Sequence, residues 1–398
     1  KHALLHRIVR LQVPDSNHDH RRESCELPDR RNKITIKIKS QRISFFGIFL
    51  KKGIIMKKVI KKKLEETKQH AFEKKVLQRE KAKGAPRVGE FYKENDILLE
   101  DIDLGQIRID MKREGEDITT EEIIETTKII PLKDHMIEIT IYERKDQKDS
   151  KEKRNLVLFV HGGGFIGGDV KTKGNQCRYL AQQSGAVVVS PEYRLAPETP
   201  YPGAEEDVLG TIDWLEENAD RFNIDTDKMA IMGESAGGHL AVNVCLKDKK
   251  QRMKLVVSVY GVMDMSVAED TPYHWDYSLY QMEEEQKDYI MNRLFRFKEL
   301  NDSMNDLYLQ NGESTLDGEI SPLFSEHLDC LPKVLMIEAE FDYFKICNEE
   351  FVKKLEEQGK DVDVIYYEGL DHGFFDRLGS LPQTQDCIDE IAKYIKEM

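Results

Sequence analysis

The sequence predicts an α/β fold, with a mostly parallel central sheet, helices on both faces and a helical cap. From residue 156 to the C-terminus, short apolar runs rich in Val and Ile recur between segments of helical period. These runs lack the alternation of half-exposed strands, and strands that are apolar on both faces are typical of parallel sheets buried between helices. A stretch from 262 to 330 interrupts this order, which predicts a separate cap.

Each element follows from its local period and composition. Two strands around a turn at Lys133-Asp134 come first, and a polar loop from Glu143 to Arg154 follows them. With these two included, strands are expected at Thr127 to Ile130, Met136 to Tyr142, Leu156 to Val160, Ala186 to Ser190, Met229 to Met232, Leu255 to Tyr260, Val334 to Glu338 and Val362 to Tyr367. Helices are expected at 173 to 183, 204 to 221, directly after Ser235, 346 to 358 and 384 to 397.

Composition sets the first part of the chain apart. Residues 1 to 55 carry 13 Lys/Arg and 5 Asp/Glu and show no sustained period. The first methionine is Met56, and a purine-rich coding sequence for Lys52-Gly53 before it would be similar to a bacterial ribosome-binding site. We therefore expect residues 1 to 55 to be a non-native or disordered leader, with a basic targeting or interaction tail as the alternative.

The rest of the chain is expected to form an N-terminal segment and a main domain. Residues 56 to 125 are the N-terminal segment, which opens with an amphipathic helix to about Lys83. Residues 126 to 398 hold the main domain, with the cap insertion at about 262 to 330. Aromatic residues that a lid can close over an apolar ligand are frequent in this insertion, and the alternative for any one of them is a place in the core of the cap itself: Tyr273, Trp275, Tyr277, Tyr280, Phe295 and Phe297.

Charge and cysteine content exclude several classes of function. The net charge is -14 for the whole chain and -22 for residues 56 to 398, which argues against binding a nucleic-acid backbone. The six cysteines show no CxxC or metal-ligand spacing, so we expect reduced thiols and no metal site. No apolar run reaches the roughly 18 residues that span a bilayer. We therefore expect a cytoplasmic protein without membrane insertion, and the sequence leaves a homo-oligomer open.

A candidate nucleophile lies in Gly233-Glu234-Ser235-Ala236-Gly237, which fits the G-x-S-x-G nucleophile elbow. The motif stands between an expected strand and an expected helix, as the elbow requires. Its glycines leave room for a strained turn that presents the Ser235 hydroxyl, and the helix N-terminus behind it favours negative charge. A glycine-rich structural turn is the alternative interpretation.

A glycine run, His161-Gly162-Gly163-Gly164-Phe165, follows the expected strand from Leu156 to Val160. The backbone N–H groups of Gly163 and Gly164, together with that of Ala236, can hold a tetrahedral oxyanion. The Lys-Ser/Thr pair of a phosphate-binding loop is missing. We interpret His161 as a residue that braces the loop, with a direct acid-base role as the alternative.

A serine hydroxyl needs an adjacent base to become a good nucleophile. His372 follows the last expected strand, at the sheet edge where loops converge on the elbow, and we predict it as the general base. Asp342 precedes His372 by one helix and one strand, which gives the order serine, acid, histidine. Glu340 is the main competitor for the acid, and Glu338 should still lie in the strand.

With these residues in place, the sequence resembles the hormone-sensitive-lipase-like branch of the α/β-hydrolase esterases. Three blocks carry the resemblance: His161 to Phe165, Gly233 to Gly238, and Tyr193 to Glu198 continuing to Pro202 and Asp207. The resemblance implies an α/β-hydrolase catalytic domain with a two-part cap over an acyl pocket. Residues 56 to 125 would be the N-terminal cap segment, and the insertion at about 262 to 330 would be the second part. It also implies hydrolysis of short-chain carboxylic esters such as acetyl esters, a small-molecule substrate and no cofactor.

Two departures from the family pattern stand out. Glu234 replaces the usual aspartate before the serine, and after Asp342 the usual Pro-Leu and second acidic residue are replaced by Tyr343-Phe344 and Ile346. We assign the segment from Tyr193 to Glu198 to structure, as a loop braced by its own Arg and Glu. Two other functions stay open, a peptidase of the same fold and a non-catalytic small-molecule receptor, although such receptors typically lose the histidine.

Overall fold

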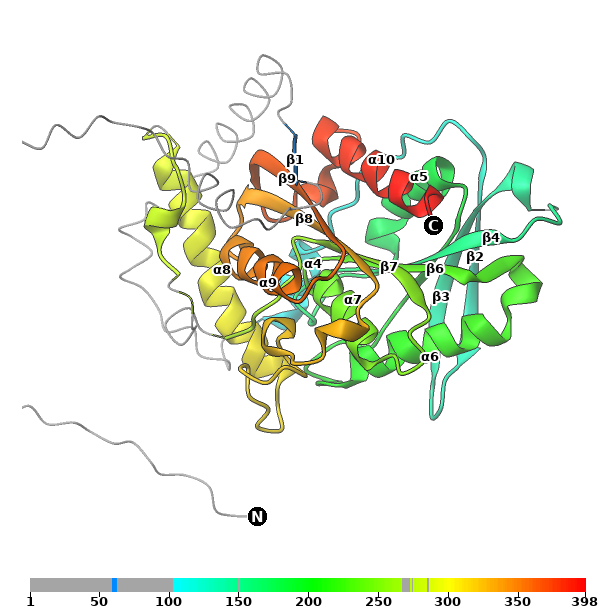
Figure 1. Ribbon diagram of the computed structural model, residues 1–398, viewed down its shortest axis with the longest axis horizontal. Coiled ribbons are helices and arrows are strands. Elements are labelled where there is room, and N and C mark those ends of the chain that lie inside the picture. The colour runs from blue at the N-terminus through cyan, green and yellow to red at the C-terminus, as the bar shows by residue number, and fades with distance from the viewer. Residues whose placement is uncertain (1–58, 63–102, 149, 267–272, 274, 285) are drawn as a thin grey trace, which may run out of the picture. The chain divides into compact units, whose positions relative to one another are not determined.

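The computed structural model describes residues 103 to 148, 150 to 266, 273, 275 to 284 and 286 to 398, together with the backbone of 59 to 62 (Figure 1). The leader expected at 1 to 55 lies outside these residues, as does most of the expected N-terminal cap segment. In the cap insertion, residues 267 to 272 and positions 274 and 285 lie outside as well.

One sheet runs through the described part of the chain, with nine strands in the order β1-β9-β8-β7-β6-β4-β5-β3-β2. β2 pairs antiparallel with β3 and β3 with β5, and every other neighbouring pair is parallel. The predicted mostly parallel sheet is therefore confirmed. The strands are β1 (Val59–Lys62), β2 (Ile123–Pro131), β3 (Met136–Arg144), β4 (Arg154–Val160), β5 (Val187–Pro191), β6 (Ile224–Glu234), β7 (Met253–Val259), β8 (Lys333–Phe341) and β9 (Val362–Asp371).

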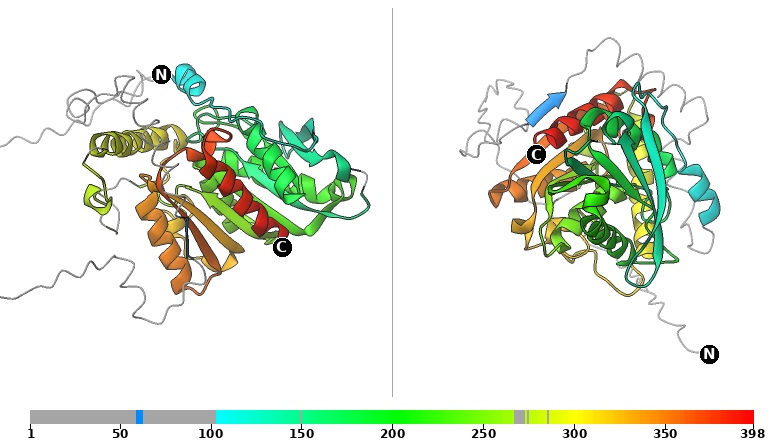
Figure 2. Two further views of the ribbon diagram at one scale, coloured as in Figure 1. Left: turned by 90° about the horizontal axis from the view of Figure 1, so that it is seen from above. Right: turned by 90° about the vertical axis from the view of Figure 1, so that its right-hand side faces the viewer.

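Helices cover both faces of this sheet (Figure 2). α6, α7 and α9 pack on one face, and α5 and α10 pack on the other. The long helix α8 lies in the cap insertion, where the sequence predicted a lid with helices of its own. The described helices are α4 (Leu104–Asp110), α5 (Gly174–Ser184), α6 (Gly203–Glu217), α7 (Ala236–Lys247), α8 (Lys287–Tyr308), α9 (Lys345–Glu357) and α10 (Pro382–Lys396).

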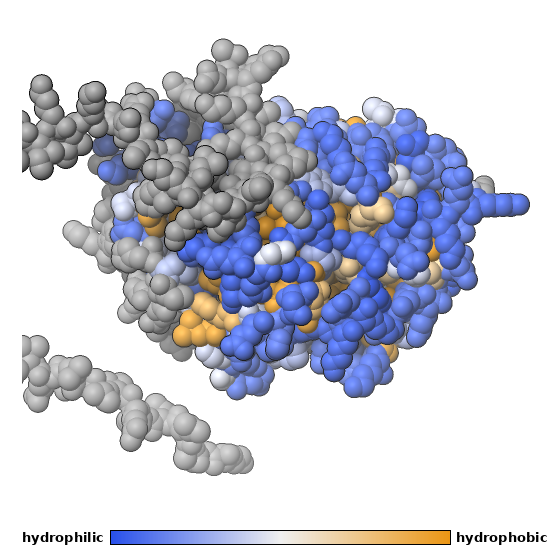
Figure 3. Space-filling view, in the orientation of Figure 1, coloured by the Kyte–Doolittle hydropathy of each residue, from blue (hydrophilic) through white to orange (hydrophobic). Residues whose placement is uncertain are grey.

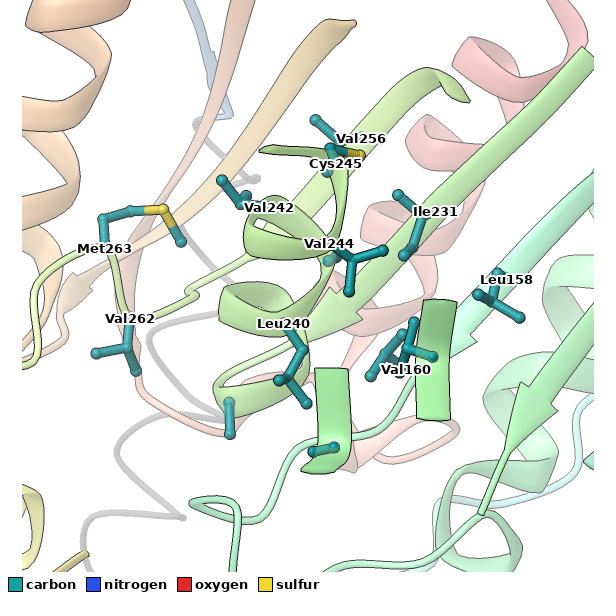
Figure 4. Packing of buried hydrophobic residues seen from close by; sticks show 14 of the residues in the cluster. Leu158, Val160, Ile231, Leu240, Val242, Val244, Cys245, Val256, Val262 and Met263 are labelled. Carbon is teal, nitrogen blue, oxygen red and sulfur yellow. The ribbon is translucent and has the colours of Figure 1, made fainter. Parts of the chain in front are cut away.

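The core explains why these apolar runs form a parallel sheet, since both faces of the central strands are buried. Figure 4 shows the part of the core in which α7 lies over β4, β6 and β7. Leu240 of α7, Ile231 of β6 and Leu158 of β4 belong to this cluster and are fully buried. Truncating such a leucine to alanine typically costs about 2 to 5 kcal/mol. The helix that follows Ser235 is therefore held firmly against the sheet.

The prediction of an amphipathic helix from 56 to 83 is wrong for its first residues. Val59–Lys62 forms β1, which pairs in parallel with β9, with Val59 opposite Val364. The pair Val59-Ile60 is β-branched and the edge of β9 offers unpaired backbone groups, so strand addition satisfies the backbone where helix formation would leave that edge open. The remainder of the expected helix lies outside the described residues.

The described surface is largely hydrophilic on the face shown in Figure 3. Among the described residues, the large apolar side chains that are exposed are Ile109, Ile129, Met136, Leu279 and Leu316. These positions are scattered through α4, β2, β3 and the cap insertion. No helix in the described ranges is both long enough and apolar enough to cross a membrane.

Candidate active site

The turn between β6 and α7 carries Ser235. Its backbone adopts φ 56° and ψ -124°, a conformation that residues other than glycine rarely take. The flanking glycines make the turn possible, because a Cβ at Gly233 would lie 2.2 Å from the Gly237 carbonyl oxygen. One at Gly237 would lie 2.0 Å from the carbonyl oxygen of Val160. A strained conformation persists only where the surrounding structure holds it in place, and here the buried ends of β4 and β6 hold the turn.

Three of the predicted site residues meet in one hydrogen-bonded chain. Ser235 Oγ lies 2.8 Å from His372 Nε2, and His372 Nδ1 lies 2.7 Å from Asp342 Oδ2. The three residues follow β6, β9 and β8, and parallel strands place their carboxyl ends at one edge of the sheet. Asp342 is completely buried and His372 is 6% exposed. This is the arrangement of a nucleophile, a base and an acid that orients the base.

Opposing effects act on the His372 imidazole. Burial favours the neutral ring and lowers its pKa, but the Asp342 carboxylate beside Nδ1 raises the pKa by its charge and its hydrogen bond. Glu234 adds to the rise, whereas Arg293 opposes it. The net pKa of His372 is above the ordinary value, which makes the ring a stronger proton acceptor toward the serine hydroxyl.

The segment after β8 separates Asp342 from its acidic neighbours. Asp342 Oδ1 accepts a hydrogen bond from the Phe344 N–H at 2.9 Å, which leaves Oδ2 for the imidazole. Glu340 is still within β8 and accepts a hydrogen bond from the Gly369 N–H at 2.7 Å. Glu338 is buried farther back in the strand, where burial raises its pKa. Of the three carboxylates, that of Asp342 is the one bonded to His372.

The glycine run after β4 forms a loop beside Ser235. Gly163 has φ 130° and Gly164 has φ 59°, conformations that glycine adopts at little cost. A Cβ at Gly163 would lie 2.1 Å from the Gly167 carbonyl oxygen, so no larger residue fits there without moving the loop. Gly163, Gly164 and Ala236 line the same pocket as Ser235. The residues predicted to supply oxyanion donors are thus gathered around one space.

His161 lies inside this loop and has no exposed surface. Its ring stacks on Tyr193 with the centroids 4.2 Å apart, and its Nδ1 lies 2.9 Å from the Gly162 carbonyl oxygen. Burial lowers the pKa of His161 to about 4, so the imidazole is neutral near pH 7. These contacts fit the interpretation of His161 as a bracing residue.

A buried ion cluster lies directly behind the elbow. Glu234 Oε1 accepts a hydrogen bond from the Gly162 N–H at 2.7 Å, which ties β6 to the glycine loop. Lys173 Nζ lies 3.6 Å from this carboxylate and is hydrogen-bonded to Asp376. Burial raises the pKa of Glu234, and the Lys173 charge limits the rise. Lys173 and Asp376 could not be predicted from the sequence, because no local spacing relates two positions so far apart.

A pocket with a volume of about 250 Å³ contains Ser235. Phe297, Leu300 and Met304 of α8 line it from the cap. Of the six aromatic residues noted in the cap insertion, Phe297 is the one in this lining, and Tyr277, for example, packs on Phe295 instead. Within the described ranges, no group of three His, Cys, Asp or Glu side chains is arranged to hold a metal ion.

The segment from Tyr193 to Glu198 is braced by partners outside itself, which corrects the expected internal Arg-Glu pair. Arg194 pairs with Asp207 of α6 at 2.8 Å, because the bidentate geometry of the guanidinium matches that carboxylate. Glu198 pairs with Arg108 of α4 at 2.6 Å. Arg108 also donates to the backbone just after the glycine run. The segment therefore connects α4, α6 and the glycine loop.

Comparisons with known proteins show the family of the chain. Residues 157 to 376, more than half of the chain, match the family model described as alpha/beta hydrolase fold. The arylesterase of Saccharolobus solfataricus is 29% identical over 269 residues, which cover 68% of this chain and 82% of that protein. The ethyl acetate hydrolase of Pseudomonas putida is 28% identical over 256 residues, which cover 63% of this chain and 75% of that protein.

Solved structures lead to the same family. An esterase from Pyrobaculum calidifontis shares 26% identity with a TM-score of 0.63, over 77% of this chain and 96% of the esterase. A thermostable carboxylesterase cloned from a metagenomic library shares 27% identity with a TM-score of 0.59, over 70% of this chain and 90% of that enzyme. The chain belongs to the alpha/beta hydrolase fold family, in the hormone-sensitive-lipase-like branch that its sequence resembles.

Proposed function

We propose that the protein hydrolyses short-chain carboxylic esters, acetyl esters among them, through an acyl-enzyme intermediate on Ser235. By its family and its curated relatives the chain is a carboxylic-ester hydrolase; the acyl range, the intermediate and the residue roles are the proposal. The observation that carries it is the hydrogen-bonded chain from Ser235 Oγ through His372 to Asp342, which reaches a pocket. Without such a base a serine hydroxyl is a weak nucleophile.

Acylation begins at Ser235 Oγ. His372 Nε2 accepts the hydroxyl proton while the oxygen attacks the ester carbonyl carbon. Asp342 holds the Nδ1–H of the ring, which fixes the tautomer and balances the charge of the imidazolium. When the tetrahedral intermediate collapses, the imidazolium gives its proton to the leaving alkoxide. The alcohol departs and the acyl group stays on Ser235 as an ester.

The carbonyl oxygen becomes negative during this step. The N–H groups of Gly163, Gly164 and Ala236 are proposed to stabilise it, supported by the left-handed glycine backbone and by the position of Ala236 at the N-terminus of α7. Deacylation repeats the same steps with water as the nucleophile. His372 takes a proton from the water and returns it to Ser235 Oγ as the carboxylic acid is released.

The dimensions of the pocket support a short acyl group. Its volume of about 250 Å³ is below the range of about 300 to 1,000 Å³ that is common for drug-sized ligands. Phe297, Leu300 and Met304 contribute apolar surface to the pocket that Ser235 also lines, so a few acyl carbons can leave water there. Longer chains would have to displace these side chains.

A small-molecule ester is the partner that this pocket supports. The steps above use no cofactor, because ester hydrolysis is redox-neutral and each proton transfer has a donor and an acceptor among Ser235, His372, water and the leaving group of the ester. A cytoplasmic location, a homo-oligomer and the lack of a nucleic-acid partner stay predictions of the sequence.

Substitution of the nucleophile tests the proposal. Ser235→Ala should lower kcat for p-nitrophenyl acetate by about 10⁶, with unchanged Tm, and should remove labelling by a serine-reactive phosphonate. Mass spectrometry of the labelled wild-type protein should find the adduct on Ser235. Ser190→Ala is a matched control, because this buried serine donates to the Phe159 carbonyl oxygen in the sheet and should keep full activity. A Ser235→Ala protein with more than a few per cent of wild-type activity would contradict the mechanism.

A further inference from the structure

Two side chains of the cap insertion hold the loop after β8. Tyr280 Oη donates a hydrogen bond to the Asp342 carbonyl oxygen at 2.8 Å and lies 3.3 Å from that of Tyr343. Trp275 Nε1 donates to the Tyr343 carbonyl oxygen at 3.1 Å. Tyr280 is 4% exposed, so water competes little for its bond. The backbone of the residue that contacts His372 is therefore anchored from the cap.

The cap helix α8 holds the loop after β9 in a similar way. Arg293 Nε donates to Asp371 Oδ2 at 2.9 Å, and its Nη2 donates to the His372 carbonyl oxygen at 3.0 Å. Burial would raise the pKa of Asp371, but Arg293 and Arg377 hold the pKa below the ordinary value. A charged carboxylate thus fixes α8 to the residue next to the base.

We propose that the cap insertion positions the triad, with Tyr280 holding the loop that carries Asp342 and Arg293 holding the loop that carries His372. The inference rests on the catalytic roles proposed for Asp342 and His372. Both residues lie just past their strands, where the hydrogen bonds of the sheet no longer fix the backbone. A displacement of about 1 Å between reacting groups can cost a factor of about 100 in rate. Anchors on both loops remove this freedom.

The same contacts explain why this chain departs from the family pattern after Asp342. The Tyr343 ring packs on Trp275 with the centroids 5.0 Å apart, and the Phe344 ring lies 5.7 Å from the imidazole of His372. Large aromatic residues at these positions give the cap a surface on which to pack. A Pro-Leu pair would offer less ring contact to Trp275. The aromatic replacement therefore supports the contact by which the cap holds this loop.

Tyr280→Phe removes the hydroxyl donor and keeps the ring. We expect kcat for p-nitrophenyl acetate to fall about tenfold, with KM within twofold of the wild type, because the acid loop loses its anchor but the pocket keeps its lining. In an Asp342→Asn background the same change should cost nothing further, since the position of the acid no longer matters there. Such non-additivity is the sign of two residues acting through one step.

Tyr394→Phe is the matched control for this variant. Its hydroxyl donates to Asp363 at 2.9 Å at the start of β9, the opposite end of that strand from His372. It should change stability by a similar amount and leave kcat unchanged. Equal kcat in Tyr280→Phe and Tyr394→Phe, or equal losses from Tyr280→Phe in the two backgrounds, would overturn the positioning role of Tyr280.

Arg293→Met and Arg293→Lys separate the hydrogen bond to the His372 carbonyl from the charge. Both should lower kcat about tenfold, because neither side chain can hold two acceptors in the arginine geometry. The methionine variant should also move the acidic limb of the kcat/KM profile to higher pH, because a positive charge that lowers the pKa of His372 is gone. The lysine variant should keep that limb in place. Among the described residues, the other charged groups around His372 include Asp342, Glu234 and Asp371, with Arg377 paired to Asp371 and with Lys173 and Asp376 behind Glu234.

Arg144→Met is the control for these two variants. Arg144 pairs with Asp146 at a similar exposure, 24% against 23% for Arg293, and lies at the end of β3 that is remote from the triad. Wild-type kcat in Arg293→Met, or a kcat loss in Arg144→Met of the same size, would overturn the inference. Ser235→Ala distinguishes failure of the proposed function from failure of the positioning role. If Ser235→Ala is inactive while the Tyr280 and Arg293 variants keep wild-type kcat, the proposed function stands and only the positioning role fails.

Discussion

The two halves of the candidate site are built in different ways. The sheet half, which consists of Ser235, Ala236 and the loop with Gly163 and Gly164, lies at the ends of the neighbouring strands β4 and β6. The cap half consists of Tyr280, Trp275, Arg293 and Phe297, and its side chains donate hydrogen bonds to the loops that carry Asp342 and His372. Strained backbone turns therefore shape the sheet half, whereas side-chain contacts from the cap align the acid and the base. Changes in the sheet half or in the triad should stop the chemistry, and changes in the cap half should only slow it.

The largest effect after loss of the nucleophile is expected at the acid. Asp342→Asn should lower kcat by about 10⁴, because an amide cannot hold the productive tautomer of His372. The acidic limb of the kcat/KM profile should also move to lower pH. Asp342 is the main group that raises the pKa of His372, so its loss leaves burial to lower that pKa. Rates with an acetyl ester between pH 4 and 9 measure both changes.

Glu340→Gln is the control for the acid. The Glu340 carboxylate accepts from the Gly369 N–H at 2.7 Å, and a neutral amide oxygen can accept the same bond. The variant should keep kcat within a factor of about two. A large loss in Glu340→Gln together with a small one in Asp342→Asn would move the acid to the end of β8.

The next largest effect is expected in the glycine loop. Gly163→Ala should lower kcat by about 10² to 10³, because the new Cβ would lie 2.1 Å from the Gly167 carbonyl oxygen and must push the loop away from Ser235. KM should change less than kcat, since the loss falls on the oxyanion that forms during the reaction. Steady-state kinetics with an acetyl ester provide the measurement.

Gly359→Ala separates backbone strain from the active site. Gly359 also has a positive φ, 71°, but no atom lies within 4 Å of the position of its Cβ. The substitution should therefore lower stability modestly and leave kcat unchanged. If Gly163→Ala kept near-normal kcat, Gly163 would have no part in binding the oxyanion.

The sequence predicted the sheet, its helices and the elbow because these depend on local signals. The apolar runs without alternation became parallel strands, and the expected strand from Met229 to Met232 became the centre of the longer β6 (Ile224–Glu234). The same local reasoning failed for 59 to 62, where β1 forms because the edge of β9 is available. Helical period is a property of one segment, but pairing with a strand 305 residues away is a property of the fold.

The triad could be predicted from local signals as the sheet was, but the residues that support it could not. Ser235, His372 and Asp342 each follow a strand in the expected order, so a motif and the position in the chain were enough to predict them. Lys173 and Arg293 were missed, since a single basic residue on a helix gives no sign of which carboxylate it will meet. The partners of Tyr280 are backbone carbonyl oxygens, which carry no sequence signal at all.

Lys173 lies behind the sheet half, and its loss should act on stability. Lys173→Met should lower the free energy of unfolding by about 3 to 5 kcal/mol, because the buried Glu234 and the partly buried Asp376 would lose their cation. The loss of unfolding free energy should be smaller at pH 5 than at pH 8. Burial already raises the pKa of Glu234, so at the lower pH its carboxylate can take up a proton, and a neutral carboxyl group costs less to bury without a cation. Urea unfolding at the two pH values measures this difference.

Lys393→Met is the control on the surface. Lys393 is 62% exposed and pairs with Glu390 on the same helix, so its loss should cost at most about 1 kcal/mol. A Lys173→Met protein with a comparable small loss would show that the buried cluster does little for stability.

The smallest effect is expected in the lining of the pocket. Phe297 faces the pocket from α8 and its ring lies 4.5 Å from the imidazole of His372. The unmodified enzyme should turn over acetyl to butyryl p-nitrophenyl esters faster than octanoyl esters. Phe297→Ala should enlarge the pocket and raise the ratio of octanoyl to acetyl kcat/KM by about tenfold, since each additional buried methylene contributes about 0.8 kcal/mol.

Phe295→Ala tests whether any aromatic residue of α8 has this effect. Phe295 packs on Tyr277 with the centroids 4.3 Å apart, so its loss should lower stability without changing the acyl preference. Because the two positions lie on one helix, general loosening of the cap would change both variants alike, whereas contact with the acyl chain would change only Phe297→Ala. Faster turnover of long-chain esters by the unmodified enzyme, especially with activation at an oil-water interface, would contradict the short-chain proposal and indicate a lipase.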